Sequence, residues 1–350
     1  MSRLASVAVA VALVCLLSSC GTHRRELESQ VPPQGRSPTS TAQLARDTLA
    51  ILERGAGQLA TLSSDSLIPL TEAASLVSRR TGSIRAHSLV HEFADALLRA
   101  RVTRAKVTGY YDAESAGLPR ARATAEAGLA LSEAYAATGE RAYADATTAA
   151  AADIRNPALG WVSAAASSGV RLSPRGRVNV SATADAALLL KRAATLGERE
   201  AGASSQAALR TIYTSQAAVG RWYAEIGTHR PMTLGEWART LFDLQADGSP
   251  TSVGITGGGM PALFEASFGT GGQGPGGYSI TASAPSDVAL AARALAAFGE
   301  GASSEAAFRG LLGLRRDDGT IRLAASEDLV SQSNFALAFA QRLAGPALLG

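Results

Sequence analysis

Cysteine is almost absent from this chain of 350 residues, which contains only Cys15 and Cys20. Cys15 lies inside an apolar run, and Cys20 ends the short segment of small residues that follows the run. If the chain is cut before Cys20 and that residue is itself modified, no free thiol, disulfide or cysteine metal ligand remains.

Aromatic residues are also scarce, at 5% of the chain. Most of them are expected to fill the core between helices. A cavity lined by aromatic rings, as a terpenoid or another lipid would need, is therefore disfavoured.

Charge of one sign is not in large excess, because 33 basic residues face 30 acidic ones. Removal of residues 1–19 would take away one arginine and leave about +2, which does not indicate nucleic-acid binding. The sequence contains neither Gly-x-x-x-x-Gly-Lys nor Gly-x-Ser-x-Gly, so ATP hydrolysis and ordinary serine esterase chemistry lack their signatures. We expect no cofactor.

A glycine-rich stretch, GTGGQGPGG at 269–277, contains a formal Gly-x-Gly-x-x-Gly. A dinucleotide site needs a strand before this motif and a helix after it, and neither is indicated here. We interpret residues 254–277 as a long loop that could act as a lid over a pocket.

The first residues have the layout of a secretory signal. Arg3 precedes an unbroken apolar run of 11 residues from Val7 to Leu17, too short for the roughly 20 that span a bilayer. The stretch Leu17-Ser18-Ser19-Cys20 resembles the lipobox of bacterial lipoproteins, in which the cysteine receives a diacylglyceryl group. This resemblance implies a signal peptide at 1–19, lipidation of Cys20 and an extracytoplasmic protein anchored to the cell membrane. An ordinary cleaved signal and an uncut anchor are the alternatives.

The next segment, residues 20–42, is polar, contains adjacent Pro32 and Pro33, and shows no apolar periodicity. It predicts a disordered tether between the anchor and a folded domain at 43–350.

Three segments of the chain fall into one register: ATAEAGLALSEAYAATGE, ATADAALLLKRAATLGE and APSDVALAARALAAFGE. Each has an acid near its start, then an apolar run, then Gly-Glu, as is typical of a helix. These helices are apolar nearly all round, so each should be buried on most of its surface. More amphipathic segments lie between them, at 141–154 and 204–225, and further helices are indicated at 41–62, 85–102 and 333–339.

Repeated helical pairs predict an all-α fold that is either an open solenoid or a closed ring. The chain resembles the α/α-toroid proteins, which include terpenoid cyclases, prenyltransferase subunits and several polysaccharide-acting enzymes. The stretches LFDLQADGSP (241–250) and LLGLRRDDGTIRL (311–323) add to this resemblance, although they depart from the Gln-x-x-Asp-Gly repeat of terpenoid cyclases. It implies a toroid of about five to seven helical hairpins, in which each repeated segment is an inner helix.

In toroids of this kind, the loops that lead into the inner helices usually line the pocket. The resemblance therefore directs attention to carboxylates and polar groups near those helix starts. The catalytic candidates are Glu126, Asp185, Asp287 and Tyr111, and the ligand-binding candidates are Arg120, Arg122, Arg177, Asn179, Tyr110, Trp161 and Asn334. Arginine, asparagine and carboxylate groups together would suit an acidic sugar or a polar headgroup. The alternative is that the acids only stabilise helix starts.

Two smaller features complete the candidates. Tyr110, Tyr111 and Trp161 follow glycine or lie in Gly-Pro loops, so we expect them to be exposed, where they could stack on sugars. His87 and His91 stand four apart on a predicted helix beside Glu92, which would place both imidazoles on one face. The sequence is not His-Glu-x-x-His, so no metal site is assigned and a histidine pair without metal is preferred.

Three functions remain open at this stage, and the residues leave open whether the chain is an enzyme. The first is a pocket that binds or processes a polar, glycan-derived ligand in the cell envelope. The second is a non-catalytic scaffold whose helical faces bind another envelope protein. The third is terpenoid or lipid binding.

Overall fold

The structure, a computed structural model, describes residues 41–112, 117–164, 167–173, 175–217, 221–246, 285–298, 301–312 and 329–344. All of them belong to one compact unit, Ser40–Gly350. The predicted signal peptide, nearly all of the tether, the glycine-rich loop 254–277 and most of 311–323 lie outside the described residues. No helix in the described ranges is long and apolar enough to span a membrane.

Eleven α-helices are described. They are α2 (Thr41–Gly57), α3 (Ser64–Thr81), α4 (Ile84–Arg99), α5 (Ala121–Thr138), α6 (Arg141–Ile154), α7 (Val180–Thr195), α8 (Arg199–Thr214), α9 (Leu234–Ala246), α11 (Pro285–Ala297), α12 (Gly301–Leu312) and α13 (Leu329–Ala344). Two short 3-10 helices, η1 (Leu59–Thr61) and η3 (Pro157–Leu159), and five short strands complete the elements.

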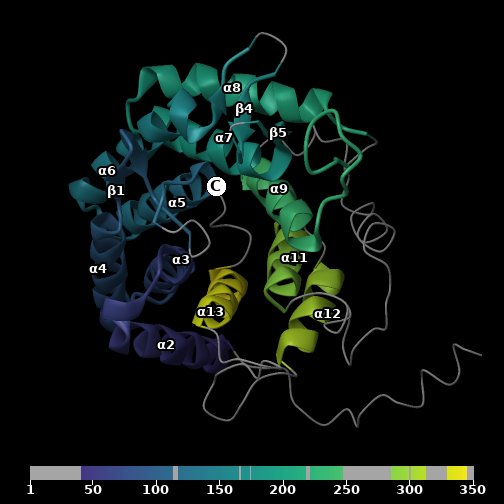
Figure 1. The fold of residues 1–350 in the computed structure, drawn as a ribbon. Coiled ribbons are helices and arrows are strands. Elements are labelled where there is room, and N and C mark those ends of the chain that lie inside the picture. Colours follow the sequence, from purple (N-terminus) through teal and green to yellow (C-terminus); the bar gives the residue numbers. More distant parts are fainter. Residues whose placement is uncertain are drawn as a thin grey trace, which may run out of the picture. The chain divides into compact units, whose positions relative to one another are not determined.

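Six of these helices form a closed inner ring, seen in Figure 1. Each of α3, α5, α7, α9, α11 and α13 packs against the next, and α13 returns to α3. The helices α2, α4, α6, α8 and α12 lie outside it, each packed on an inner neighbour. The α/α toroid and the inner position of the three repeated segments (α5, α7 and α11) are therefore confirmed.

Small residues let the inner helices approach closely. Most of α5 is buried, and more than half of its buried residues are alanine or glycine. A Cβ on Gly128 would lie only 2.7 Å from Leu189 of α7 and 2.9 Å from Ala150 of α6. The helix ends at Gly139, whose φ of 73° is in the left-handed region that glycine adopts without strain. The sequence therefore repeats because each inner helix needs small residues at the positions where its neighbours approach closely.

Short turns and long connections alternate along the chain, so they lie at opposite ends of the ring. The long connections contain the strands β1 (Val102–Arg104), β2 (Val107–Gly109), β3 (Trp161–Val162), β4 (Gly169–Arg171) and β5 (Val178–Asn179). The strand β1 pairs antiparallel with β2, and β4 lies between β3 and β5. These connections sit over the starts of α5, α7 and α9.

One predicted helix is shorter in the structure. The segment 204–225 was expected to be helical throughout, but α8 ends at Thr214. The following chain turns back, and the indole Nε1 of Trp222 donates a hydrogen bond to the carbonyl of Ile212 at 2.9 Å. Burial of this ring against the helix end is a tertiary contact that the local pattern does not contain.

Candidate functional site

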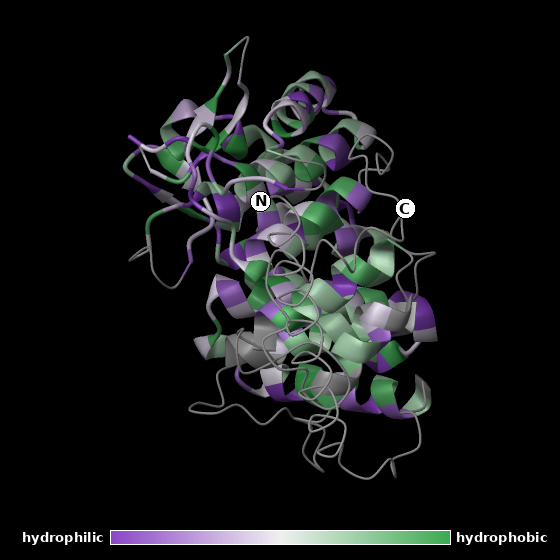
Figure 2. Cartoon of the chain, turned by 90° about the vertical axis from the view of Figure 1, so that its right-hand side faces the viewer, coloured by the Kyte–Doolittle hydropathy of each residue, from purple (hydrophilic) through white to green (hydrophobic). Residues whose placement is uncertain are grey.

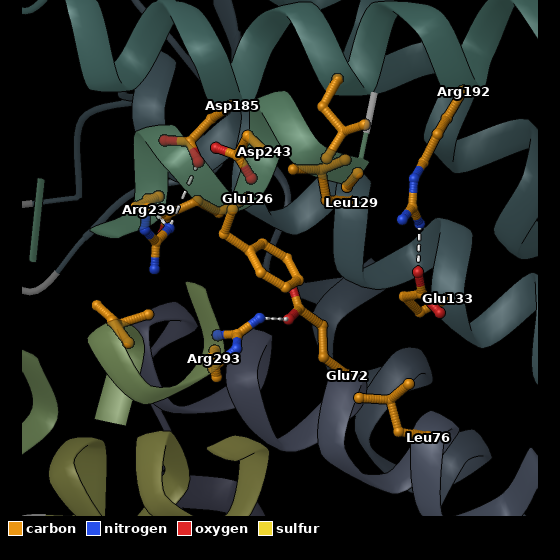
Figure 3. A pocket seen from close by; sticks show the side chains of 14 residues that line it. Glu72, Leu76, Glu126, Leu129, Glu133, Asp185, Arg192, Arg239, Asp243 and Arg293 are labelled. Atoms are coloured by element: carbon orange, nitrogen blue, oxygen red, sulfur yellow. Dashed lines mark hydrogen bonds and ion pairs between the residues drawn. The ribbon is translucent and has the colours of Figure 1, made fainter. Parts of the chain in front are cut away.

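The centre of the ring is charged. It encloses a cavity of about 60 Å³, lined by eight charged and six apolar side chains from five inner helices, many of them visible in Figure 3. The lining residues are Glu72, Leu76, Glu126, Leu129, Glu133, Asp185, Leu188, Arg192, Arg239, Phe242, Asp243, Ala246, Leu290 and Arg293. Phe242 is the single aromatic residue among them, which does not favour a terpenoid or lipid ligand.

Two sequence candidates meet at one arginine that the sequence analysis did not select. Glu126 of α5 forms an ion pair with Nη1 of Arg239 on α9. Oδ1 of Asp185 on α7 lies 3.7 Å from the same nitrogen. One guanidinium therefore joins three inner helices, and Figure 3 shows Arg239 beside Asp185.

Burial changes the acidity of this cluster. It raises the pKa of Glu126 to about 7, opposed by Arg239 and reinforced by the charge of Asp185. The pKa of Asp243 is raised well above its usual value, again mainly by burial, then by the charge of Asp185 and a hydrogen bond to it. Such a bond requires a proton between the two carboxyl groups, and the raised pKa assigns that proton to Asp243.

A second ion-pair cluster lies about two turns further along the same helices. Glu133 of α5 bonds Nη1 of Arg79 at 2.7 Å and Nη1 of Arg192 at 2.5 Å. Between the clusters, Nη2 of Arg293 lies 3.7 Å from Glu72. Burial lowers the pKa of Arg293 to about 10 and raises that of Glu72.

Charges of both signs face one another around the ring centre. The four arginines 79, 192, 239 and 293 lie against the five carboxyl groups of Glu72, Glu126, Glu133, Asp185 and Asp243. Networks of this kind are costly to desolvate and are seldom the most stable way to fill a core. A purely stabilising core would be expected to use aliphatic residues, so the charged lining indicates a functional constraint.

Polar groups with unused bonding capacity lie beside this centre. Nη2 of Arg122 donates to Oδ1 of Asn179 at 3.4 Å, and the same nitrogen lies 4.0 Å from Glu236. Oδ1 of Asn179 also accepts from the N–H of Ala182 and so caps α7. Nε of Arg122 and Nδ2 of Asn179 are buried donors without a hydrogen-bond partner. Buried unpaired donors are costly, so these two suit a ligand oxygen or a water.

Asp287 lies in the first turn of α11, close to this group. Its Oδ1 lies so near the backbone of α9 that a Cβ on Gly235 would be 2.4 Å away. Burial raises the pKa of Asp287, and Arg239 lowers it. The acids of α5, α7 and α11 thus all approach Arg239. Glu126 and Asp185 lie in the second turn of their helices, one turn later than Asp287 does.

Other candidates lie apart from the centre. Arg120 and Arg177 are exposed, and Nη1 of Arg177 donates to the carbonyl of Gly227 at 2.5 Å. Tyr111 and Asn334 are half-buried. No contact of Arg120, Arg177 or Tyr111 with the ring centre is observed in the described part of the chain.

The prediction that Tyr110 and Trp161 are exposed is wrong. Tyr110 is fully buried, and its N–H donates to Oγ1 of Thr124 at 2.9 Å. Trp161 is 7% exposed, because β3 pairs it with Val170 in a small sheet that packs on the core. The neighbouring glycines shape these turns and do not expose the rings.

The histidine pair faces an aromatic partner. The rings of His87 and His91 meet edge to face, with centroids 5.1 Å apart. Nδ1 of His91 lies 3.0 Å from the hydroxyl of Tyr143, which donates to Asp95 at 2.9 Å. Glu92 instead pairs with Arg85 at 2.9 Å. In the ranges that the structure describes, no group of three or more His, Cys, Asp or Glu side chains could hold a metal ion.

The sequence contains a signal for the residues that were missed. The inner helices repeat charges seven residues apart, with the pairs Glu72/Arg79, Glu126/Glu133 and Asp185/Arg192. That spacing places both charges of a pair on one face of a helix. Charges at this period inside apolar helices are expected to face one another across a ring, and this signal could have selected Arg192 and Glu133.

Comparisons with known proteins agree on the fold. No family model matches the chain, and no curated protein matches it. Among solved structures, the chain is similar to a GH76A α-1,6-mannanase variant from Salegentibacter (TM-score 0.59, 12% identity, 89% of this chain and 100% of that one). It is also similar to a family 76 glycoside hydrolase from Bacteroides thetaiotaomicron (TM-score 0.55, 13% identity, 83% and 68%). A GH76 α-mannanase from the same species gives a TM-score of 0.56 at 13% identity, covering 87% and 95%. At this identity the likeness establishes a shared α/α-toroid fold with glycan-processing enzymes.

Proposed function

We propose that this chain is a lipid-anchored extracytoplasmic protein that binds or processes a glycan-derived ligand at the end of its ring where Glu126, Arg122 and Arg239 lie. The observation that carries the proposal is the charged ring centre. The toroid shared with glycan-processing enzymes supports the ligand class, and the charged lining supports a polar ligand within it.

The partly exposed groups of the centre suit sugar hydroxyls. The side chains of Glu126, Arg239 and Arg122 are 19%, 24% and 31% exposed, so a ligand can reach them, whereas Asp185 is 1% exposed. The free donors of Arg122 and Asn179 and the carboxylate of Glu126 together offer both donors and acceptors. Each hydroxyl needs both.

A reaction at this site would use Glu126 as the general acid. Its pKa of about 7 keeps it largely protonated in mildly acidic surroundings, which is the state that protonates a leaving oxygen. The mannanase variant described as inactive carries asparagine at two consecutive aspartates; in this chain, consecutive acids occur only at 317–318 and 327–328, outside the described residues.

A non-catalytic scaffold is the second candidate, and one observation favours it. The cavity of about 60 Å³ is several times smaller than the roughly 300 Å³ at the lower end of ligand pockets. A sugar ring therefore fits at the mouth of the site and not inside it. If the mouth of the ring centre binds no ligand, the ion pairs around it serve only to join the inner helices.

Thermal unfolding of the full chain tests the proposal. We would add neutral and acidic oligosaccharides, including α-1,6-linked mannose, to the wild type, Arg122→Met and the control Arg141→Met, whose side chain is 78% exposed. A ligand at 100 times its Kd adds about 2.7 kcal/mol of stability, which raises Tm by several degrees. The site is supported if a glycan raises the Tm of the wild type and of Arg141→Met but does not raise the Tm of Arg122→Met. No shift with any glycan contradicts it and favours the scaffold.

The anchor has a separate test. We expect Cys20→Ser to abolish incorporation of labelled palmitate and to move the chain from the membrane to the soluble extracytoplasmic fraction, since two acyl chains give a stable anchor. Cys15→Ser, inside the apolar run, is the matched control and should leave lipidation intact. Equal incorporation by both variants would rule out Cys20 as the lipid site.

A further inference from the structure

Exposed cations crowd one end of the ring. They lie in the connections 100–120, 155–179 and 215–233, which lead into α5, α7 and α9. Nine basic side chains in these connections are exposed: Arg101, which pairs with Asp153, and Arg104, Lys106, Arg120, Arg171, Arg175, Arg177, Arg221 and Arg230. Two acids are described in the same connections, Asp112 and Glu225. Both are half-buried, so neither is exposed as the cations are. We call this set of cations the basic end.

Exposed apolar side chains stand among these cations. Leu118, Leu172 and Tyr223 are 51%, 38% and 36% exposed, and each lies within two residues of an exposed arginine. One therefore occurs in each of the three connections. Of the large hydrophobic side chains found exposed in the described ranges, only Ile84 lies elsewhere, at the short turn that starts α4.

The three connections form one continuous layer. The N–H of Val180 donates to the carbonyl of Ala224 at 3.0 Å, and that of Ile226 donates to Val178 at 2.9 Å. Val107 packs against the apolar cluster that contains Leu159. In Figure 2, these loops and strands gather at the left and mix hydrophilic with hydrophobic segments.

Arginines interspersed with isolated apolar side chains fit one kind of partner. Anionic headgroups attract the cations at about 1 kcal/mol each, and leucine or tyrosine side chains enter the boundary between headgroups and acyl chains. A soluble acidic polymer would satisfy the cations but would leave Leu118 and Leu172 in water.

We propose that the basic end docks on a membrane surface that carries anionic lipids, so that the mouth of the ring centre faces the bilayer. This orientation follows from the placement of the three connections and needs neither lipidation of Cys20 nor glycan binding. It goes beyond the proposed function and does not rest on it.

An environment-sensitive bimane label tests the docking. We would use the full chain with Cys15→Ser and Cys20→Ser, labelled at Leu172→Cys or, as the matched control, at Ile84→Cys. Vesicles of phosphatidylcholine alone are compared with vesicles that contain 30% phosphatidylglycerol. The apolar leader is present in every sample, so the label reports only which end meets the bilayer. We expect a blue shift at position 172 with anionic vesicles in low salt, and none at position 84.

Charge variants make the result specific. We expect a triple variant to lower the ratio of docked to undocked protein about a hundredfold; it combines Arg104→Gln, Arg171→Gln and Arg175→Gln. The variant with lysine at the same three positions should retain the wild-type ratio. Circular dichroism checks that both variants fold. A label at 172 that stays unshifted with anionic vesicles overturns the proposal, as does an equal shift at 84. A response to dextran sulfate as strong as that to vesicles overturns it in favour of an acidic polysaccharide.

Discussion

Nη1 of Arg239 on α9 lies 3.7 Å from Oδ1 of Asp185 on α7, and the same nitrogen pairs with Glu126 of α5. A single side chain thus neutralises carboxylates from two other helices. The burial of Glu126 and Asp185 depends on Arg239, because a buried carboxylate without a counterion is strongly unfavourable.

Removal of this cation should therefore be costly. We expect Arg239→Met to lower the free energy of unfolding by about 3–5 kcal/mol, as for other buried pairs that lose one partner. Arg141→Met, which breaks an exposed pair with Asp145 within α6, should cost only about 0.3–0.5 kcal/mol. Urea denaturation measures both, and similar values for the two variants would contradict the central role of Arg239.

Glu126 should make stability fall as pH rises. Its folded pKa is raised to about 7, so the folded state keeps a proton that the unfolded chain releases near pH 4.5. The stabilisation is complete below about pH 4.5 and is lost as pH rises to 7, by about 3 kcal/mol. We expect Glu126→Gln to remove that part of the pH dependence, measured by urea denaturation from pH 4 to 8.

The matched control for this experiment is Glu53→Gln on α2, whose side chain is 49% exposed. It should retain the wild-type pH dependence. Burial also raises the pKa of Asp243 and Asp287, which changes stability in the same direction, so the difference between the wild type and Glu126→Gln isolates one group. A wild type that becomes more stable between pH 5 and 7 would show that the sign is wrong.

The proton shared by Asp185 and Asp243 predicts unequal effects of two similar substitutions. Asp243→Asn keeps a donor facing Asp185, so we expect a change below about 1 kcal/mol at pH 7. Asp185→Asn loses the charge facing Arg239 and should cost about 1–3 kcal/mol. Chemical denaturation of both variants checks the order, and the reverse order would place the proton on Asp185.

Helix spacing gives a prediction independent of charge. Gly128→Ala should destabilise by about 1–3 kcal/mol, because the new methyl group would meet Leu189 at 2.7 Å and Ala150 at 2.9 Å. Gly202→Ala on α8, where the nearest atom is Ala194 Cβ at 3.6 Å, should stabilise by about 0.5–1 kcal/mol. Thermal unfolding distinguishes them. Stabilisation by both would mean that α5 and α7 can separate without cost.

The sequence predicted the helices and their repetition, because the apolar period and the glycine caps are local properties. Gly139 ends α5 as expected, and the segment 141–154 coincides with α6. It did not predict that Trp161 is buried, since the small sheet that covers it joins residues up to 18 positions apart.

Part of the site was predictable in the same way. Glu126 and Asp185 were selected from their matching positions in the repeats, and both line the ring centre. Arg120 and Arg177 were selected only because they precede the same helices, and they face outward. Direction relative to the ring axis depends on how each helix is rotated, which a loop residue's place in the sequence does not specify.

By itself, the sequence determined that the chain is helical and repetitive and has few aromatic side chains to line a cavity, because propensity, period and composition are set residue by residue. Only the tertiary structure decided that six helices close into a ring and that Arg239 is the common partner of Glu126 and Asp185. Ring closure and ion pairing join residues more than fifty positions apart, and the free energy of such contacts depends on burial and distance, which exist only after the chain has folded.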